Sequence, residues 1–438
     1  MARKIKEPAR ETEVFGEFDV AVVGGGPAGV CAGLSAARHG LKTLLIEQMG
    51  ALGGMATTGL HQHIGVYAGS GGTPEIVGGI GREVTHRAVK GAESSFGGYT
   101  SDVEIEAFKL LLDRMAEEAG LKLLYYSQVG DTLVEDNKLI GVILNNKSGR
   151  FAVLAKRVID CSGDGDVAFR AGCRMMHGRD EDHKMQPTTL MYRVGGVDRK
   201  KLLEYQKTDP RLEKFCKLAA EKGLMRPWQA CLMGFWWIPS RPDQINANFT
   251  HMHLDGTSAF DMTEAAIEGR KQVHEAVRAM RELIPGFEKS YLIDTAPYIG
   301  IRETRRIYGE YVITADDIKA QKISEDSIGL GSAFIDIHNV TGPGMDKRSG
   351  YHLPNGGYYS IPYRTLVPEK MDNLLVAGRC HSATHEAAGS TRWMAQAMVM
   401  GHAAGTAAAL GIRDNVLPRR LDVTKLQETL KKEGAILS

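Results

Sequence analysis

The segment from residue 20 to residue 29, Val-Ala-Val-Val-Gly-Gly-Gly-Pro-Ala-Gly, constrains the fold of this chain more than any other feature. Residues 18–23 are mostly apolar and predict a buried β-strand, and Gly24-x-Gly26-x-x-Gly29 predicts a tight turn into a helix. Residues 41–46 predict a second buried strand, which is followed by the acidic residue Glu47. Strand, glycines, helix, strand and acid in this order indicate a βαβ unit of a parallel sheet.

The glycines and the acid each suit one part of a bound dinucleotide. Gly24 allows the tight turn, Gly26 lets a pyrophosphate approach the backbone, and Gly29 lets the helix lie close to the sheet. The N–H groups and the positive end of that helix favour the phosphates. Glu47 can accept hydrogen bonds from both hydroxyls of a ribose. We therefore predict a dinucleotide site rather than an ordinary βαβ turn.

The far end of the chain indicates which dinucleotide is bound. No second G-x-G-x-x-G follows, since the nearest stretch, Gly329-Leu-Gly-Ser-Ala, lacks the last glycine. An enzyme with one such site must hold its redox centre there. Residues 373–379 predict a short strand that ends in Gly-Arg, followed by the loop 381–390 and a long helix from about 391 to 410.

This ending resembles the late FAD motif of the glutathione-reductase-like flavoproteins, which are two-domain, FAD-only proteins. In particular it is similar to the FAD-dependent oxidoreductase family, in which a strand, Gly-Arg, a Ser-Ala-Thr-His-Glu loop and an Arg-x-Met helix follow one another. Segments 52–57, 78–83, 158–166, 300–306 and 360–364 extend the resemblance from about residue 18 to residue 410. It implies an α/β fold, with a discontinuous Rossmann-like FAD-binding domain that contains a β-meander, and a mixed α+β substrate domain.

The resemblance also implies which residues contact the cofactor. FAD is expected to be bound non-covalently, because no histidine precedes the stretch 53–59, where related succinate-dehydrogenase flavoproteins attach their flavin. The N-terminus of the final helix, near Arg392, is expected to face the flavin ring and to stabilise the negative charge of its reduced form. The expected cofactor-binding residues are Gly24, Gly26, Pro27, Ala28, Gly29, Glu47, Gln48, Gly54, Met55, Ala56, Val129, Ser162, Gly163, Gly378, Arg379, Ser390, Thr391 and Arg392.

The predicted domains are discontinuous along the chain. Residues 15–65, 101–173 and 351–415 are expected to form the FAD-binding domain, residues 174–350 the substrate domain, and residues 416–438 a helical extension. Residues 66–100 are rich in glycine and predict either a mobile cover over the site or an irregular link. Within the first domain, Ser101-x-x-Glu104 predicts a capping box, residues 121–126 a third parallel strand, and runs near 130–134, 139–144 and 151–155 the β-meander.

Charge and composition narrow the class of protein. The formal net charge of +1 gives no electrostatic footprint for nucleic acid. The cysteines are scattered without a C-x-x-C pair, which indicates a reducing compartment, and the charged N-terminal segment lacks the apolar core of a secretory signal. We therefore expect a cytoplasmic protein, and a homo-oligomer is compatible with the sequence.

The one long apolar run, residues 393–412, predicts a buried core helix rather than a membrane span. It contains the polar residues Gln396, His402 and Thr406, which would be expensive in lipid. Its Gly401-x-x-x-Gly405 pair predicts close packing against the alanines of the first helix.

Arg302 and His385 are the candidate catalytic residues. His385 is expected to exchange the proton that accompanies hydride transfer, because histidine titrates near neutral pH. Arg302 is expected to hold a substrate anion, the alternative being an ion pair with Glu303 or Glu310. The next candidates are Tyr359, His61 and His338. The pairs His61/His63 and His251/His253 lack a third ligand type nearby, so we predict no metal site.

The sequence thus predicts an FAD-dependent oxidoreductase of the dehydrogenase or reductase type. It would transfer hydride between flavin N5 and a small polar organic substrate, with an unidentified electron acceptor or donor. Alternatives are a flavin monooxygenase or oxidase, an FAD-binding electron-carrier subunit without its own substrate, and a synthase similar to thiazole-forming proteins. The large substrate domain argues against the carrier, and the Gly-Arg turn with its final helix argues against the synthase.

Overall fold

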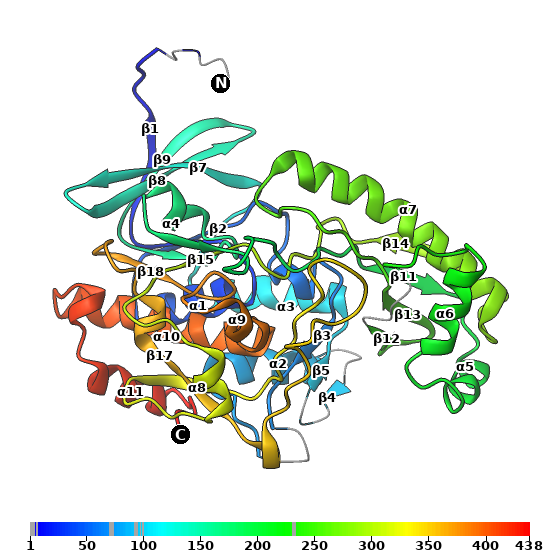
Figure 1. The fold of residues 1–438 in the computed structure, drawn as a ribbon. Helices are drawn as coiled ribbons and strands as arrows, with labels where there is room; N and C mark the ends of the chain where they lie inside the picture. The colour runs from blue at the N-terminus through cyan, green and yellow to red at the C-terminus, as the bar shows by residue number, and fades with distance from the viewer. Residues whose placement is uncertain are drawn as a thin grey trace.

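A seven-stranded sheet has the strand order β6-β2-β1-β9-β8-β7, with β18 also paired to β9, and its strands β7, β8 and β9 lie at the upper left of Figure 1. This computed structural model describes residue 5 and residues 8–69, 74–91, 95–96, 98, 100–229 and 234–438. The strands of the sheet are β1 (Glu13–Val23), β2 (Thr43–Ile46), β6 (Lys122–Leu124), β7 (Ser127–Glu135), β8 (Lys138–Asn146), β9 (Gly149–Asp160) and β18 (Leu374–Val376). β1, β2, β6, β9 and β18 are parallel, whereas β7 and β8 are antiparallel additions. The predicted α/β fold, with its βαβ unit, third parallel strand and meander, is confirmed.

Two helices pack against each other beside this sheet, and small residues set their separation. They are α1 (Pro27–Arg38) and α10 (Met394–Arg413), which lie together in the centre of Figure 1. A Cβ atom added at Gly401 would overlap the backbone of Ala28, and one added at Gly405 would overlap that of Ala32. The predicted close packing of the glycine pair on the first helix is therefore confirmed. Within the described residues, no helix has the length and apolar character needed to cross a membrane.

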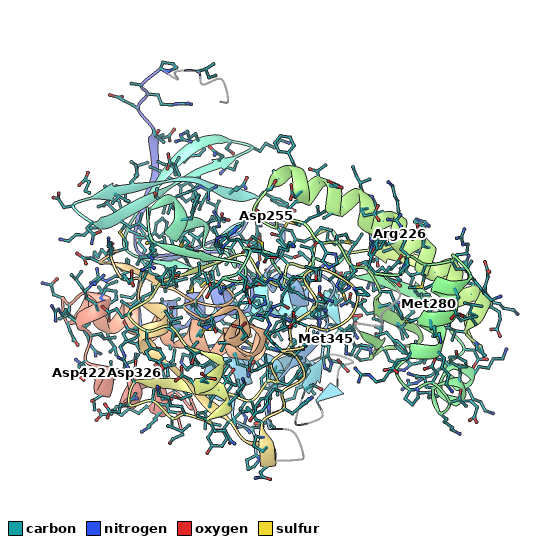
Figure 2. All side chains as sticks on the ribbon, viewed as in Figure 1. Arg226, Asp255, Met280, Asp326, Met345 and Asp422 are labelled. Atoms are coloured by element: carbon teal, nitrogen blue, oxygen red, sulfur yellow. The ribbon has the colours of Figure 1, made fainter. Side chains whose placement is uncertain are left out.

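A second unit is built on a four-stranded antiparallel sheet with the order β12-β13-β11-β14. Its elements are β11 (Tyr192–Gly195), α5 (Arg199–Gln206), α6 (Glu213–Glu221), β12 (Gly234–Ile238), β13 (Arg241–Asn248), α7 (Ala259–Leu283) and β14 (Tyr291–Thr295). This unit has its own hydrophobic core, to which α7 contributes Val273 and Met280. Figure 2 shows Met280 on this side of the molecule and Asp422 on the other, with Met345 between them in this view.

The remaining strands and helices belong to neither of these two sheets. These elements are η1 (Gly54–Ala56), β3 (His63–Gly65), α2 (Gly79–Gly91), β4 (Ser95–Phe96), β5 (Thr100–Asp102), α3 (Ile105–Glu118), α4 (Asp166–Arg170), β10 (Met175–His177), β15 (Arg305–Ile307), α8 (Ala315–Lys319), β16 (Ser327–Gly331), η2 (Pro354–Gly356), β17 (Tyr359–Pro362), η3 (Tyr363–Leu366), α9 (His385–Thr391), η4 (Pro418–Arg420) and α11 (Val423–Lys432). The domain limits stay a prediction. However, the apolar residues of segment 313–337, which we assigned to the substrate domain, pack in the same core as α1 and α10.

The structure corrects three local predictions. The capping box at Ser101 is wrong, because Ser101 pairs with Ile64 across β5 and β3, and α3 begins at Ile105 without a side-chain cap. The glycine-rich stretch 66–100 contains α2, which packs against α10, although its residues 70–73, 92–94, 97 and 99 lie outside the described residues. The final helix is not continuous from residue 391, since α9 ends at Thr391 and α10 begins at Met394.

The interruption before α10 follows from two side-chain anchors. Trp393 has an extended backbone, and its indole N–H donates a hydrogen bond to the Gly389 carbonyl oxygen (3.1 Å). The Arg392 guanidinium donates to a carboxylate oxygen of Asp336 (2.7 Å between Nη2 and Oδ2). These bonds hold residues 392 and 393 in place between the helices. No glycine or proline marks this position in the sequence.

Candidate functional site

One cavity of about 1070 Å³ joins the carboxyl ends of the parallel strands to the four-stranded sheet. At one end it is lined by residues that follow β1, β2, β9 and β18, and we call this the nucleotide end: Gly24, Gly26, Glu47, Gly163 and Arg379. Its other part is rich in histidine and charged side chains, and we call this the histidine chamber: His61, Trp236, Arg302, Asp336, His338 and Arg392.

The three glycines of the first turn have distinct positions at the nucleotide end. Gly24 has a φ of +99°, and a Cβ atom there would overlap the carbonyl oxygen of Cys161. A Cβ atom at Gly26 would meet no atom within 4 Å, because this glycine, the N-cap of α1, faces open space. Gly29 does not line the cavity, and a Cβ atom there would overlap the Gly24 carbonyl oxygen. The turn is therefore closely packed on two sides and open only towards the cavity.

Glu47 closes the nucleotide end beside this turn. Its side chain is buried, and the N–H groups of Gly25 and Met49 donate to its two carboxylate oxygens at 2.6 Å and 2.7 Å. Burial raises the pKa of the Glu47 carboxyl, although these backbone hydrogen bonds oppose the shift. Each carboxylate oxygen retains a second lone pair, which can accept a hydrogen bond from a ribose hydroxyl.

We expect Glu47→Ala to weaken FAD binding by about 1.5–3 kcal/mol for each charge-assisted hydrogen bond lost, with water substituting in part. The variant should also unfold at a lower temperature than the parent protein, because the N–H groups of Gly25 and Met49 lose their acceptor. Titration of the apoprotein with FAD and thermal unfolding measure the two effects. An unchanged FAD affinity would place the ribose elsewhere.

The turns after β9 and β18 complete the nucleotide end. The Asp160 carboxylate accepts hydrogen bonds from the Ser162 N–H (3.0 Å) and hydroxyl (2.6 Å), which fixes the turn that carries Gly163. The Arg379 guanidinium donates to the Asp164 carboxylate (2.8 Å between Nη1 and Oδ1) and lines the cavity. The nucleotide end thus offers backbone N–H groups of glycine turns, a carboxylate and a fixed guanidinium. These donors and acceptors fit the pyrophosphate and ribose of FAD.

Most of the residues predicted to bind the cofactor come together around this cavity. Those that line it are Gly24, Gly26, Pro27, Ala28, Glu47, Gln48, Gly54, Met55, Val129, Ser162, Gly163, Gly378, Arg379 and Arg392. Gly29, Ala56, Ser390 and Thr391 do not. Ser390 and Thr391 are fully buried in α9, where their hydroxyls donate to the carbonyl oxygens of Ala333 and Ala387. The helix end that reaches the cavity is that of α10, through Trp393 and Met394.

Arg302 and the Asp336–His338 pair lie in the histidine chamber. Arg302 is 8% exposed, and its guanidinium donates a hydrogen bond to the Pro187 carbonyl oxygen (2.7 Å). His338 Nε2 lies 3.4 Å from Asp336 Oδ1, and the other oxygen of Asp336 accepts from Arg392. Asp336 therefore bridges a fixed cation and an imidazole, an arrangement that can orient the imidazole ring.

The histidines of the chamber are uncharged at neutral pH. Burial and then the charge of Arg302 lower the pKa of His338 to about 4. Burial and the neighbouring His63 lower the pKa of His61, whose ring lies against Trp236, to about 4. Burial would raise the pKa of Asp336, but His338 and Arg392 hold it below its usual value. The pair is thus a neutral imidazole beside an ionised carboxylate, so His338 can accept a proton.

His385, which is expected from the sequence to act on the substrate, does not line the cavity. It is the first residue of α9, it is 3% exposed, and its Nδ1 lies 2.8 Å from Glu303 Oε1. His381 is also buried away from the cavity, with its Nδ1 bonded to the Gly378 carbonyl oxygen. Both histidines follow the Gly-Arg turn in the sequence. Their positions in the sequence do not show in which direction the side chains point. No group of three or more His, Cys, Asp and Glu among the described residues is arranged for a metal ion.

The model of a family described as FAD dependent oxidoreductase matches residues 19–430. Among curated relatives, the thiamine thiazole synthase of Methanothermobacter thermautotrophicus is 33% identical over 156 residues, which cover 34% of this chain and 56% of that protein. Digeranylgeranylglycerophospholipid reductase 1 of Methanococcoides burtonii is 29% identical over 198 residues, covering 42% of this chain and 46% of that protein. The matches thus span about half the length of these relatives.

Among solved structures, a geranylgeranyl bacteriochlorophyll reductase-like protein from Thermoplasma acidophilum aligns with 96% of this chain and 84% of its own. The sequence identity is 16% and the TM-score 0.47. The flavin-dependent brominase Bmp2 aligns with 95% of this chain and 83% of its own, at 15% identity and a TM-score of 0.47. Similarity at this level carries no argument about the substrate.

Proposed function

This chain belongs to the FAD dependent oxidoreductase family, and from this premise we propose that it transfers hydride between its bound FAD and a small polar organic substrate in the histidine chamber. FAD is the cofactor of the protein, and its activity is that of an oxidoreductase. When bound, FAD supplies the hydride acceptor or donor at N5 of its flavin ring. Three expectations stay predictions: the placement in the glutathione-reductase-like superfamily, the domain limits and a cytoplasmic location.

One observation carries the proposal: the nucleotide end and the histidine chamber belong to the same cavity. A substrate beside Arg302 and His338 would therefore share this space with the cofactor. Binding sites of this kind combine a concave shape with a few converging polar groups, some of which have displaced pKa values. The histidine chamber meets each of these conditions.

In the proposed reaction, one residue of the histidine chamber stabilises negative charge and another accepts a proton. Arg302 is a permanent cation and can hold a carboxylate or a developing oxyanion, but it cannot move protons. His338 can accept a proton from a substrate hydroxyl, and Asp336 orients the ring and stabilises the imidazolium that forms. Arg392 and the N-terminus of α10 favour negative charge at the same wall of the cavity. These groups argue against an electron carrier without its own substrate.

A second candidate function is supported by the thiazole synthase relative. The match covers about a third of this chain. Turnover would then depend on the consumption of a bound nucleotide instead of on reversible reduction of FAD. Recovery of unchanged FAD after many turnovers would contradict this alternative.

We expect the flavin to be released from the protein by acid precipitation. His61 lines the cavity and is the histidine nearest in sequence to the stretch 53–59, yet it packs against Trp236 with a ring-centroid distance of 4.8 Å. Absorbance of the supernatant and of the redissolved pellet measures the two fractions. Flavin that stays in the pellet would show a covalent bond.

The proposed function is tested by anaerobic reduction of the flavin. Small hydroxy acids, amino acids, alcohols and amines are mixed with the purified holoprotein, and bleaching of the flavin absorbance is followed with and without oxygen. We expect one of these compounds to bleach the flavin in a saturable manner, with NADH and NADPH acting slowly. If NADPH alone bleaches it rapidly, the protein is a monooxygenase or a pyridine-nucleotide reductase, and the proposal is wrong.

A further inference from the structure

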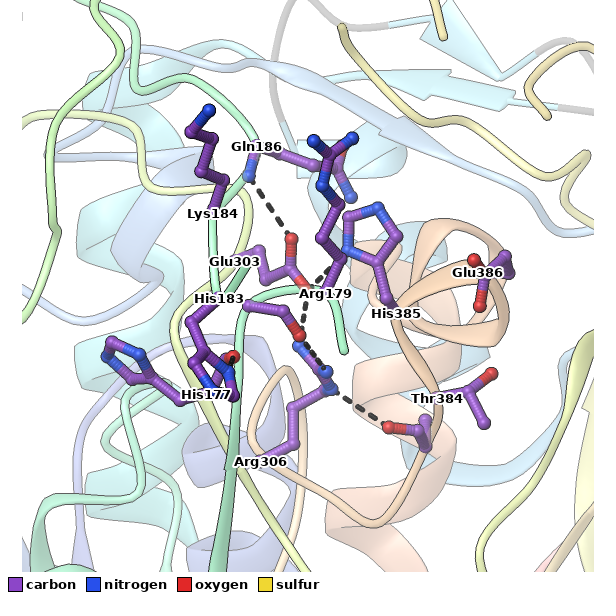
Figure 3. A network of polar contacts seen from close by, with 12 residues as sticks. His177, Arg179, His183, Lys184, Gln186, Glu303, Arg306, Thr384, His385 and Glu386 are labelled. Atoms are coloured by element: carbon purple, nitrogen blue, oxygen red, sulfur yellow. Dashed lines mark hydrogen bonds and ion pairs between the residues drawn. The ribbon is translucent and has the colours of Figure 1, made fainter. Parts of the chain in front are cut away.

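Figure 3 shows a buried ionic network that includes Glu303, Arg306 and His385. Glu303, Arg306 and His385 are 2%, 1% and 3% exposed, and none of them lines the cavity. Buried charges reduce stability unless they are paired and hydrogen-bonded. Their retention here calls for a structural or functional reason.

Glu303 is the centre of the network. Its Oε1 accepts hydrogen bonds from His385 Nδ1 (2.8 Å) and from the Arg306 guanidinium, and its Oε2 accepts from the Gln186 N–H (3.1 Å). Burial would raise the pKa of Glu303, but the charge of Arg306 and the bond to His385 hold it below its usual value. Glu303 is therefore an ionised acceptor, and Nδ1 of His385 must carry a proton.

The segment 186–187 connects this network to the chamber. The side-chain oxygen of Gln186 accepts a hydrogen bond from the backbone N–H of His338 (3.1 Å). The carbonyl oxygen of the next residue, Pro187, accepts from the Arg302 guanidinium (2.7 Å). Gln186 is fully buried and its own N–H is bonded to Glu303. Two consecutive residues thus contact the backbone of His338 and the guanidinium of Arg302, and the first of them is anchored by the Glu303 carboxylate.

We propose that His385, Glu303 and Arg306 form a positioning network, which sets Arg302 and His338 in their reactive geometry through residues 186 and 187. His385 acts as a positioning residue and not on the substrate, because its contact with the chamber passes through Glu303 and Gln186. The inference rests on the proposed roles of Arg302 and His338. A displacement of about 1 Å in such groups can lower a rate by about 10²-fold, which is the physical reason for a rigid support.

His385→Ala is the variant that tests the network. It removes one donor from Glu303 and leaves the Arg306 charge paired, so folding is at less risk than in Glu303→Gln. His385→Asn is the conservative rescue, because the asparagine amide nitrogen can take the place of Nδ1. His402→Ala is the matched control, since His402 is also a 3% exposed histidine bonded to a glutamate, Glu433, and does not line the cavity.

The primary readout is amide hydrogen exchange of the FAD-bound protein at Gln186 and His338. We expect His385→Ala to accelerate exchange at both amides about tenfold, the effect of losing one hydrogen bond, and His385→Asn to restore the parent rates. His402→Ala should lower the unfolding temperature and leave both amides at the parent rates. Unchanged exchange in His385→Ala, an equal change in His402→Ala, or no rescue by asparagine would each overturn the proposal.

A second readout separates this proposal from the proposed function. With a compound that reduces the flavin, His385→Ala should reduce the flavin about tenfold more slowly at saturating concentration, with a normal FAD content. A parent-like rate would overturn the positioning role. The exchange measurement needs no substrate, so altered exchange in a protein that no polar compound reduces would leave the network intact and refute the hydride-transfer proposal alone.

Discussion

Gly26→Val is expected to give a folded protein that does not bind FAD. Gly26 has φ −70° and ψ −174°, an extended conformation that valine adopts without strain. A Cβ atom built at this position has no protein atom within 4 Å, so the valine side chain projects into the nucleotide end of the cavity. A pyrophosphate held at the N-terminus of α1 would need that space. Visible absorbance gives the FAD content, and circular dichroism with thermal unfolding gives the folded fraction.

Gly29→Ala is the contrasting variant for this experiment. A Cβ atom at Gly29 would overlap the Gly24 carbonyl oxygen, so alanine must push α1 away from the turn. We expect this variant to lose stability, whereas Gly26→Val loses only the cofactor. A Gly26→Val protein that remains folded and fully loaded with FAD would place the pyrophosphate elsewhere.

The nucleotide half of the site could be predicted because its determinants are local in sequence. Gly24, Gly26, Gly29 and Glu47 lie within one βαβ unit, and the backbone geometry of that unit fixes where each residue points. The packing of α10 on α1 could also be predicted. Gly401 and Gly405 are one turn apart on an apolar helix, which indicates close contact with another helix. The family match then confirms FAD as the cofactor.

The break between α9 and α10 could not be predicted, since its causes are distant in sequence. Arg392 is held by Asp336, which is separated from it by 56 positions, and Ser390 and Thr391 just before it are fully buried. A distant contact also explains the wrong prediction at Ser101. The pattern Ser-x-x-Glu fits a capping box, but Ser101 lies in β5, where it pairs with β3. In both places tertiary contacts override a local signal.

The choice between His385 and His338 illustrates the same limit for the chemistry. Both are histidines near charged residues, and no spacing in the sequence shows which of them faces the cavity. Glu303 binds His385 from 82 positions away and turns it from the cavity. His338 reaches the chamber because it follows Asp336 by two positions, on the same side of an extended segment. Only the folded structure brings it beside Arg302.

His338→Ala is expected to lower the rate of flavin reduction by about 10²–10⁴-fold, the usual loss when a positioned proton acceptor is removed. FAD content should stay at the parent level, because His338 lies in the histidine chamber and not at the nucleotide end. The control is His253→Ala, which removes a nearby histidine that is bonded to the Asn339 carbonyl oxygen and does not line the cavity. That variant should reduce its flavin within about twofold of the parent rate. Equal rates for His338→Ala and the parent would exclude His338 as the proton acceptor.

The pH dependence and Arg302→Met complete this test. Since His338 must be unprotonated to accept a proton and its pKa is about 4, the parent rate of substrate oxidation should be constant near neutral pH and fall as the pH drops through about 4. His338→Ala should lose that fall and keep a low, flat rate. The charges facing the ring are Asp336, Arg302 and Arg392, with His251 beside it at a centroid distance of 5.9 Å. Arg302→Met removes the charge that lowers the pKa of His338 most, so the fall in rate should move to higher pH, and binding of an anionic substrate should weaken. A fall that stays in place in both variants would assign the titration to another group.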